Sequence, residues 1–139
     1  MVPPVPNARG LVVDLYPLQA RVARIDIDLI LHISAPDFGQ SEPRATIELM
    51  NLLFTDASKV RCQYAIDKTL KGVHLNLEKN GVLGPVTFLG TPSGYELEAL
   101  VHALECWAEP GRTTLDPSYQ RLMKEIIKPL GADLFVAPT

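Results

Sequence analysis

The ten residues RIDIDLILHI, at positions 24–33, decide the fold. Every odd-numbered position from 25 to 33 is Ile or Leu, so these side chains share one face of a β-strand. The residues on the other face change from charged, at Asp26 and Asp28, to apolar, at Ile30. The strand is therefore predicted to begin half-exposed and to become buried on both sides, as a strand in the middle of a sheet does.

The residues after this strand predict a helix and then a second strand. Residues 34–41 are punctuated by Pro and Gly and read as a loop. Ser41 can cap the helix, with Glu42 and Pro43 in its first turn, and the helix should end around residues 56–58. Residues 60–66 alternate again. A β-helix-β unit of this length implies a right-handed crossover and parallel pairing of the two strands.

The next segment predicts a β-hairpin and another helix. Apolar residues alternate over 73–78 and again over 85–90, and Lys79-Asn80-Gly81 supplies the turn. The helix that follows carries an apolar stripe at the i, i+3, i+4 and i+7 positions, and Pro110-Gly111 ends it. The stripe consists of Leu97, Leu100, Val101 and Leu104, with Trp107 near it. The order β-α-β-β-β-α predicts an α/β protein, an open mixed sheet with helices packed on its faces.

The two ends of the chain give weaker signals. Residues 1–10 contain three prolines and read as a loose arm, followed by a short helix within 14–23 that begins near Pro17. Near the C-terminus, Asp116 and Pro117 form an N-cap and N1 pair. The helix they start has the apolar stripe Tyr119, Leu122, Met123, Ile126 and Ile127.

Pro129 should stop this last helix, and Leu134–Val136 then reads as a strand. It has no hairpin partner in the sequence, so it must join an existing sheet edge, pair with another chain, or belong to something longer. The chain is thus predicted to divide into 1–23, 24–112 and 113–139.

Composition narrows the class of protein. Of the 139 residues, 47% are hydrophobic and 21% are charged, which is typical of a globular domain. The net charge is −3 and the basic residues are scattered, so nucleic acid is not an expected partner. The apolar runs are too short to cross a bilayer and no signal peptide is evident, so no membrane association and a cytoplasmic location are expected.

The segment GPVTFLGTPSGYELEALVHAL, residues 84–104, resembles a known family. It is similar to the pattern F-x-G-x-P-x-G-H-E-F-x-x-L-V-x-A-L of tandem thioredoxin-fold units. Such units occur at the N-terminus of the alkyl hydroperoxide reductase flavoprotein subunit and in glutaredoxin-like protein disulfide oxidoreductases. Tyr95 and Leu97 stand where the family usually has His and Phe. The matching residues are Phe88, Gly90, Pro92, Gly94, Glu96, Leu100, Val101, Ala103 and Leu104.

The resemblance covers roughly residues 25–139 and implies a thioredoxin-like unit. In this family the first unit often lacks a C-x-x-C motif. The second unit begins with a helix and a strand that lead directly to its redox cysteines, and residues 116–128 and 134–136 resemble these two elements. Either the natural protein continues past Thr139 into a C-x-x-C unit or this relative has lost that unit.

Thiol chemistry has no evident site in this chain. Exchange needs an accessible, low-pKa thiolate at a helix N-terminus and a second thiol close by. The expected place, residues 34–43, has no cysteine. Cys62 falls on the inward face of a strand and Cys106 late in a helix, so buried, inert thiols are expected. The resemblance places a cis-proline before the third strand, where this chain has Gly72.

Other candidate sites have simpler interpretations. Glu98, His102 and Glu105 share one helical face and could hold a metal, but a solvated polar face opposite the leucine stripe is favoured. His32, His74 and His102 lie on three different elements. Residues 91–94 could offer backbone N–H groups to an anion, although a plain strand-to-helix connection is favoured. No catalytic, cofactor-binding or metal-ligating residue is therefore predicted.

Two functions remain open at this point. The first is a non-catalytic domain of a thiol–disulfide oxidoreductase family, which scaffolds a second thioredoxin-like unit or docks a redox partner. The second is a stand-alone interaction protein, which pairs its C-terminal helix and strand within the chain or in a homodimer.

Overall fold

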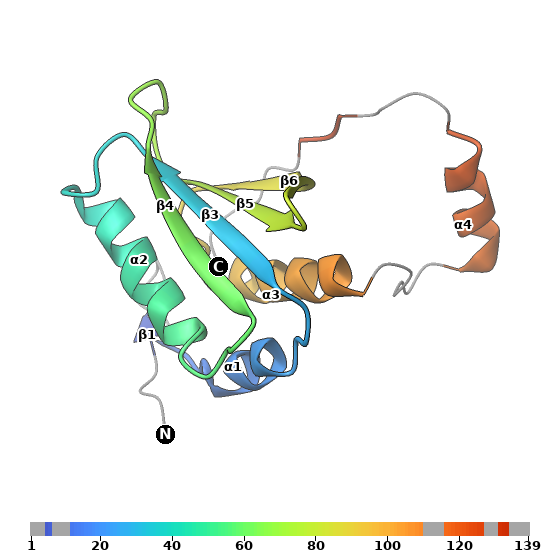
Figure 1. The fold of residues 1–139 in the computed structure, drawn as a ribbon, viewed down its shortest axis with the longest axis horizontal. Coiled ribbons are helices and arrows are strands. Elements are labelled where there is room, and N and C mark those ends of the chain that lie inside the picture. The colour runs from blue at the N-terminus through green and yellow to red at the C-terminus, as the bar shows by residue number, and fades with distance from the viewer. Residues whose placement is uncertain (1–4, 7–11, 110–115, 127–130, 134–139) are drawn as a thin grey trace.

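A computed structural model describes residues 5–6, 12–109, 116–126 and 131–133 (Figure 1). Within these residues the chain forms one open four-stranded sheet, a separate two-stranded pair, and helices. The elements in chain order are β1 (Val5–Pro6), β2 (Val12–Val13), α1 (Tyr16–Ala23), β3 (Leu29–Ala35), α2 (Ser41–Leu53), β4 (Val60–Ile66), β5 (His74–Lys79), β6 (Val82–Leu89), α3 (Tyr95–Ala108) and α4 (Pro117–Lys124).

The four-stranded sheet has the strand order β4-β3-β5-β6. β3 pairs in parallel with β4, where Leu31 lies opposite Cys62, and antiparallel with β5, where Leu31 lies opposite Leu77. β6 continues the sheet as an antiparallel neighbour of β5. The predicted mixed α/β sheet, its order of elements from β3 to α3 and the central place of β3 are confirmed.

One face of the sheet forms the core. The alternate β3 residues Leu29, Leu31, Ile33 and Ala35 are fully buried, and α1, α2 and α3 all lie on this side of the sheet (Figure 1). The helices supply most of the remaining core, which includes Leu15, Leu18, Val22, Met50, Leu53, Leu97, Leu100, Val101 and Leu104.

The other face of the sheet is open among the described residues. Its β3 side chains, Ile30, His32 and Ser34, are only half-buried, and the neighbouring β4 side chains of that face are exposed. The expectation that β3 is buried on both sides, with helices on both faces, is wrong. The physical reason is the connection from β4 to β5, residues 67–73, which contains no helix to cover this face.

Several predicted boundaries shift. β3 begins at Leu29 rather than at position 24, because Ile25 belongs to the turn that ends α1, where its N–H donates to the Val22 carbonyl at 3.1 Å. α2 begins at Ser41, so Gln40 is the N-cap residue and makes no side-chain cap bond. The predicted cap at Ser41 is therefore wrong. The helix also ends earlier than predicted, at Leu53.

The β5–β6 hairpin confirms the predicted turn. Asn80 and Gly81 have φ angles of 53° and 78°, and Lys79 lies opposite Val82. Two consecutive positive φ values in a two-residue loop identify a type I′ turn, which Asn-Gly favours. The second strand begins at Val82, before the predicted start, and the register shifts between Asn76 and Glu78.

The ends of the chain agree with the sequence in part. The short helix near Pro17 is confirmed as α1. Within residues 1–10, which read as a loose arm, Val5–Pro6 form β1, and β1 pairs antiparallel with β2, with Val5 opposite Val13. The predicted N-cap of α4 is confirmed, because the Asp116 carboxylate accepts a hydrogen bond from the Ser118 N–H at 2.9 Å.

The rest of the C-terminal prediction cannot be read from the described residues. The predicted stop at Pro129 and the predicted strand 134–136 lie outside them. No helix in the described part of the chain has both the length and the apolar character needed to cross a bilayer.

Leu31→Ala is expected to lower the free energy of unfolding by about 2–5 kcal/mol, because it leaves a cavity at a fully buried position of the central strand. Urea denaturation measures the loss. Leu89→Ala is the matched control: Leu89 is 72% exposed on β6, and its truncation should change stability by about 0.5 kcal/mol or less. Equal losses in the two variants would contradict the one-sided core.

Candidate functional site

The C-terminal end of β3 and the start of α2 form the place where the family resemblance puts a redox centre. The carboxylate of Glu42, in the first turn of α2, lies there. Two glycines approach it: a Cβ added at Gly72 or at Gly90 would lie 3.9 or 3.8 Å from Glu42 Oε1. The loop just before α2 is held by the Asp37 carboxylate, which accepts a hydrogen bond from the Gly39 N–H at 2.8 Å. The end of β3 thus presents a carboxylate and no thiol.

A buried pair of hydroxyls fixes this arrangement. Thr46 is fully buried one turn into α2, and its Oγ1 donates to the Glu42 carbonyl at 2.9 Å. Thr91 Oγ1 lies 2.6 Å from Thr46 Oγ1, and either hydroxyl can be the donor in that pair. The Gly90 N–H donates to the Val73 carbonyl at 2.8 Å. These bonds join α2, the start of β5 and the β6–α3 connection beneath Glu42.

The electrostatics of this position favour an anion. The N-terminus of a helix carries partial positive charge, and a carboxylate in its first turn is stabilised there. Glu42 is the acidic residue of the first turn of α2. A thiolate placed beside it would have the same helix dipole but would also meet the negative charge of Glu42. The site as built can accept hydrogen bonds from a ligand, and it holds no nucleophilic sulfur.

Both cysteines lie elsewhere, and both are partly exposed rather than buried as predicted. Cys62 is on β4, on the sheet face that carries the core. Burial raises the pKa of its thiol from 9.0 to about 11. Cys106 is near the end of α3, and its Sγ lies 3.5 Å from His102 Nε2. Neither thiol is at a helix N-terminus, and the two lie on different elements.

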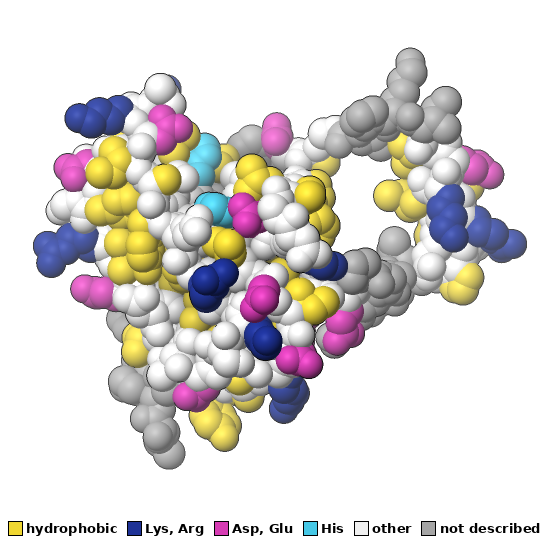
Figure 2. Space-filling model, in the orientation of Figure 1, with side chains coloured by type: hydrophobic (Ala, Val, Ile, Leu, Met, Phe, Trp, Pro, Cys, Tyr) yellow, Lys and Arg dark blue, Asp and Glu magenta, His cyan; other side chains and the backbone are white. Residues whose placement is uncertain are grey.

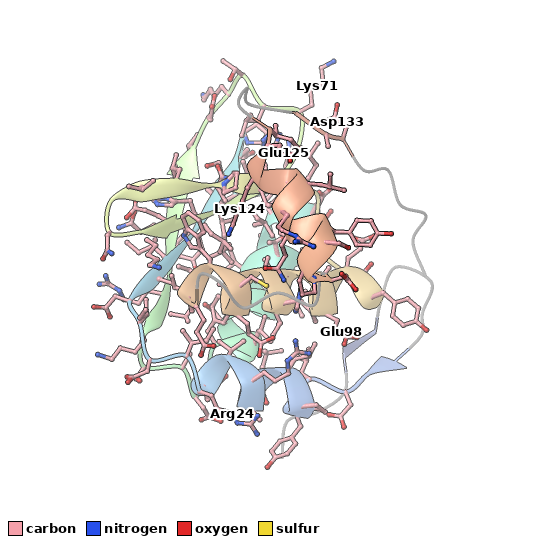
Figure 3. The ribbon with its side chains drawn as sticks, turned by 90° about the vertical axis from the view of Figure 1, so that its right-hand side faces the viewer. Arg24, Lys71, Glu98, Lys124, Glu125 and Asp133 are labelled. Carbon is pink, nitrogen blue, oxygen red and sulfur yellow. The ribbon has the colours of Figure 1, made fainter. Side chains whose placement is uncertain are left out.

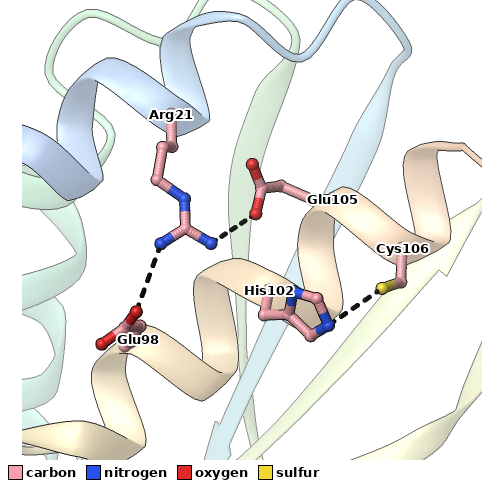
Figure 4. A network of polar contacts seen from close by, with 5 residues as sticks. All are labelled: Arg21, Glu98, His102, Glu105 and Cys106. Atoms are coloured by element: carbon pink, nitrogen blue, oxygen red, sulfur yellow. Dashed lines mark hydrogen bonds and ion pairs between the residues drawn. The ribbon is translucent and has the colours of Figure 1, made fainter. Parts of the chain in front are cut away.

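The candidate metal ligands Glu98, His102 and Glu105 do not converge. The two carboxylates turn toward Arg21 of α1: Glu105 forms a hydrogen-bonded ion pair with it, and Glu98 Oε1 lies 3.7 Å from Arg21 Nη1 (Figure 4). His102 points away from both, toward Cys106. Among the described residues no group of three His, Cys, Asp or Glu side chains could hold a metal ion.

The Arg21–Glu105 pair corrects the prediction of a solvated polar face. The Glu105 side chain is only 10% exposed, because α1 packs against this side of α3. The hydrogen bond to Glu105 raises the pKa of Arg21, so the guanidinium stays charged. The pair joins residues 84 positions apart, and no local pattern in the sequence could have identified it.

Two of the three histidines lie on the open face of the sheet. His32 lies on the open face of the sheet, where its Nε2 is 3.0 Å from Glu78 Oε1. His74 belongs to the same face, opposite Ser34. Figure 2 shows histidine side chains (cyan) on the surface of the molecule turned toward the viewer, beside acidic and hydrophobic ones. This face is polar at its centre, because it carries the His32–Glu78 pair.

Comparison with known proteins adds no assignment: no family model matches the chain, and no curated protein matches it.

The Arg21–Glu105 pair is expected to couple α1 to α3 by about 1–2 kcal/mol, since it is a charged hydrogen bond held largely out of water. A double-mutant cycle with Arg21→Met and Glu105→Gln, read by urea denaturation, measures the coupling. The matched cycle with Glu98→Gln should give about 0.5 kcal/mol or less, because Glu98 is 62% exposed. Equal coupling in both cycles would contradict the buried pair.

Cys62 should make the protein lose stability in alkali. Burial keeps its thiol neutral in the folded chain up to a pKa of about 11, whereas the thiol of the unfolded chain ionises near its ordinary value. The stabilisation is complete below pH 9 and is lost as pH rises to about 11. The free energy of unfolding should therefore fall more steeply over this window than in Cys62→Ser. Cys106→Ser, the control, should keep the steep fall.

Proposed function

We propose that this chain is a non-catalytic thioredoxin-like domain, which docks a redox protein or a second thioredoxin-like unit without exchanging disulfides itself. The observation that carries the proposal is Glu42. Its carboxylate, facing Gly72 and Gly90 at the start of α2, stands where the family resemblance puts the reactive thiol.

The fold supports this proposal. A helix that connects two parallel strands, followed by an antiparallel hairpin and a second helix, is what the resemblance implies for one unit. The chain has these parts in the order β3-α2-β4-β5-β6-α3, in a sheet ordered β4-β3-β5-β6. This order supports matching the start of α2 to the redox position that the resemblance implies.

The environment of the two thiols supports the non-catalytic part. Burial raises the pKa of the Cys62 thiol, and Cys106 lies near the end of α3, away from the start of α2. Residues 34–43 could supply hydrogen-bond acceptors to a partner, in the carboxylates of Asp37 and Glu42. Docking a partner protein requires polar contacts of this kind and does not require a reactive thiol.

The alternative, a stand-alone interaction protein, rests on a different observation. α4 has no buried residue, and its apolar side chains are exposed. An uncovered apolar helix favours a protein contact made through the tail, whether or not a second unit follows.

Restoring the thiols tests the proposal. In a Cys62→Ser, Cys106→Ser background, Ser41→Cys with Arg44→Cys creates a C-x-x-C at the start of α2. With Glu42→Gln added to remove the neighbouring negative charge, we expect the first of the two introduced thiols to titrate below about 8.5, because it lies at a helix N-terminus, and the variant to accelerate insulin reduction by dithiothreitol. The unmodified chain should give no acceleration. Thiolate absorbance against pH and insulin turbidity are the two measurements.

The control places the same C-x-x-C spacing toward the C-terminal end of α2. Glu48→Cys with Asn51→Cys should show no lowered pKa and no acceleration, since this pair lies toward the C-terminus of α2. Turnover by the unmodified chain would contradict the non-catalytic proposal. Identical titration of the two engineered pairs would contradict the assignment of the redox position to the start of α2.

A further inference from the structure

A cavity of about 380 Å³ lies where α1 and α3 end side by side. We call it the helix-end cavity. Its lining comes from the end of α1, from the turn that follows α1 and from the end of α3. Figure 3 shows Arg24 at this end of α1, and Glu98 toward the start of α3. The volume falls within the range of about 300–1,000 Å³ that is usual for small-molecule sites.

A buried ion pair forms part of the lining. Glu105 is 9% exposed, and its carboxylate accepts a hydrogen bond from the guanidinium of Arg21 (Figure 4). Such a pair adds little net stability compared with well-packed apolar side chains, because both charges must leave water. It does hold a guanidinium in a fixed direction, and a guanidinium has five N–H donors. Glu105 therefore positions a charged donor at the cavity.

Three other charged side chains line the cavity: Arg24, Asp26 and Glu109. Across the described ranges, none of the three takes part in a hydrogen bond or an ion pair through its side chain. All three are exposed. Apart from the Arg21–Glu105 pair, the cavity thus offers one cation and two carboxylates to the charged groups of a ligand.

The ends of the two helices increase the negative character of the cavity. The C-terminus of a helix carries partial negative charge and favours cations. α1 ends at Ala23 and α3 ends at Ala108, so both C-termini lie at the cavity. A ligand that matches this lining carries more positive than negative charge.

The rest of the lining is apolar. Ile25 and Ala108 are 8% and 5% exposed, whereas Ile27 is 37% exposed. A chain of methylene groups can pack against such a surface while its charged end reaches a carboxylate, as the stems of long basic side chains do. The cavity therefore combines an apolar surface for a short aliphatic chain with charges of both signs around it.

We propose that the helix-end cavity binds a free basic amino acid, for which lysine is the probe. The carboxylate of the ligand meets the guanidinium groups of Arg21 and Arg24, since arginine recognises carboxylates well. Its two ammonium groups meet Asp26 and Glu109, and its methylene chain lies on the apolar lining. One negative and two positive charges on the ligand match the one cation and two carboxylates that have no partner in the chain.

This inference goes beyond the proposed function and does not depend on it, because the cavity lies at the ends of α1 and α3 and not at the start of α2. Disulfide turnover by any variant has no bearing on it.

An NMR titration of the full chain with L-lysine tests the proposal first. We expect saturable shifts of the amide signals of residues 21–27 and 105–109, with a Kd of about 1 mM or tighter. Three probes each lack one charge of lysine: norleucine, pentane-1,5-diamine and Nα-acetyl-lysine. Each should bind about 10-fold more weakly, because one charged group of the cavity is left without a partner. No saturable shift with lysine, or equal affinity for lysine and any of the three, would overturn the proposal.

Variants test which residue meets which group. Arg24→Gln should weaken lysine binding about 10-fold and should not weaken that of pentane-1,5-diamine, which has no carboxylate. Asp26→Asn should weaken the binding of both probes. Arg61→Gln, on the open face of the sheet, is the matched control and should change neither.

Both positions in the cavity are exposed, so the variants should keep the urea denaturation curve of the unmodified chain. An equal loss of lysine and diamine binding in Arg24→Gln would overturn the proposal, and so would a loss in Arg61→Gln.

Discussion

The single buried face of β3 is the constraint on which the rest of the structure depends. β3 pairs with β4 on one side and with β5 on the other, and its alternate residues from Leu29 to Ala35 are fully buried under α1, α2 and α3. Because all three helices share this face, the chain builds one core instead of two layers of helices. The apolar stripes of α2 and α3 have no other place to be buried.

This one-sided packing also sets the candidate site. β3 ends where α2 must turn back over the sheet, so the first turn of α2 meets the start of β5 and the end of β6. The Thr46–Thr91 hydroxyl pair joins the two sides of that junction, and the Glu42 carboxylate lies beside Gly72 and Gly90. The position is fixed by the fold, whereas the chemistry depends on which side chain the first turn carries. Here that side chain is an acid.

The sequence predicted the features that local periodicity encodes. The alternation in RIDIDLILHI, the leucine stripe of α3, the Asn80-Gly81 turn and the Asp116 cap all correspond to observed elements. Features that depend on distant residues were missed. Glu105 reads as solvated because nothing near it reveals Arg21 of α1. The open sheet face was missed because Ile30 suggests burial, although no helix among the described residues covers it.

Structure and interaction are carried by different parts of this chain. The core lies within the sheet and the first three helices, and α4 adds no buried residue to it. A segment that adds nothing to the core is free to serve a contact, and its apolar stripe is otherwise a cost in water.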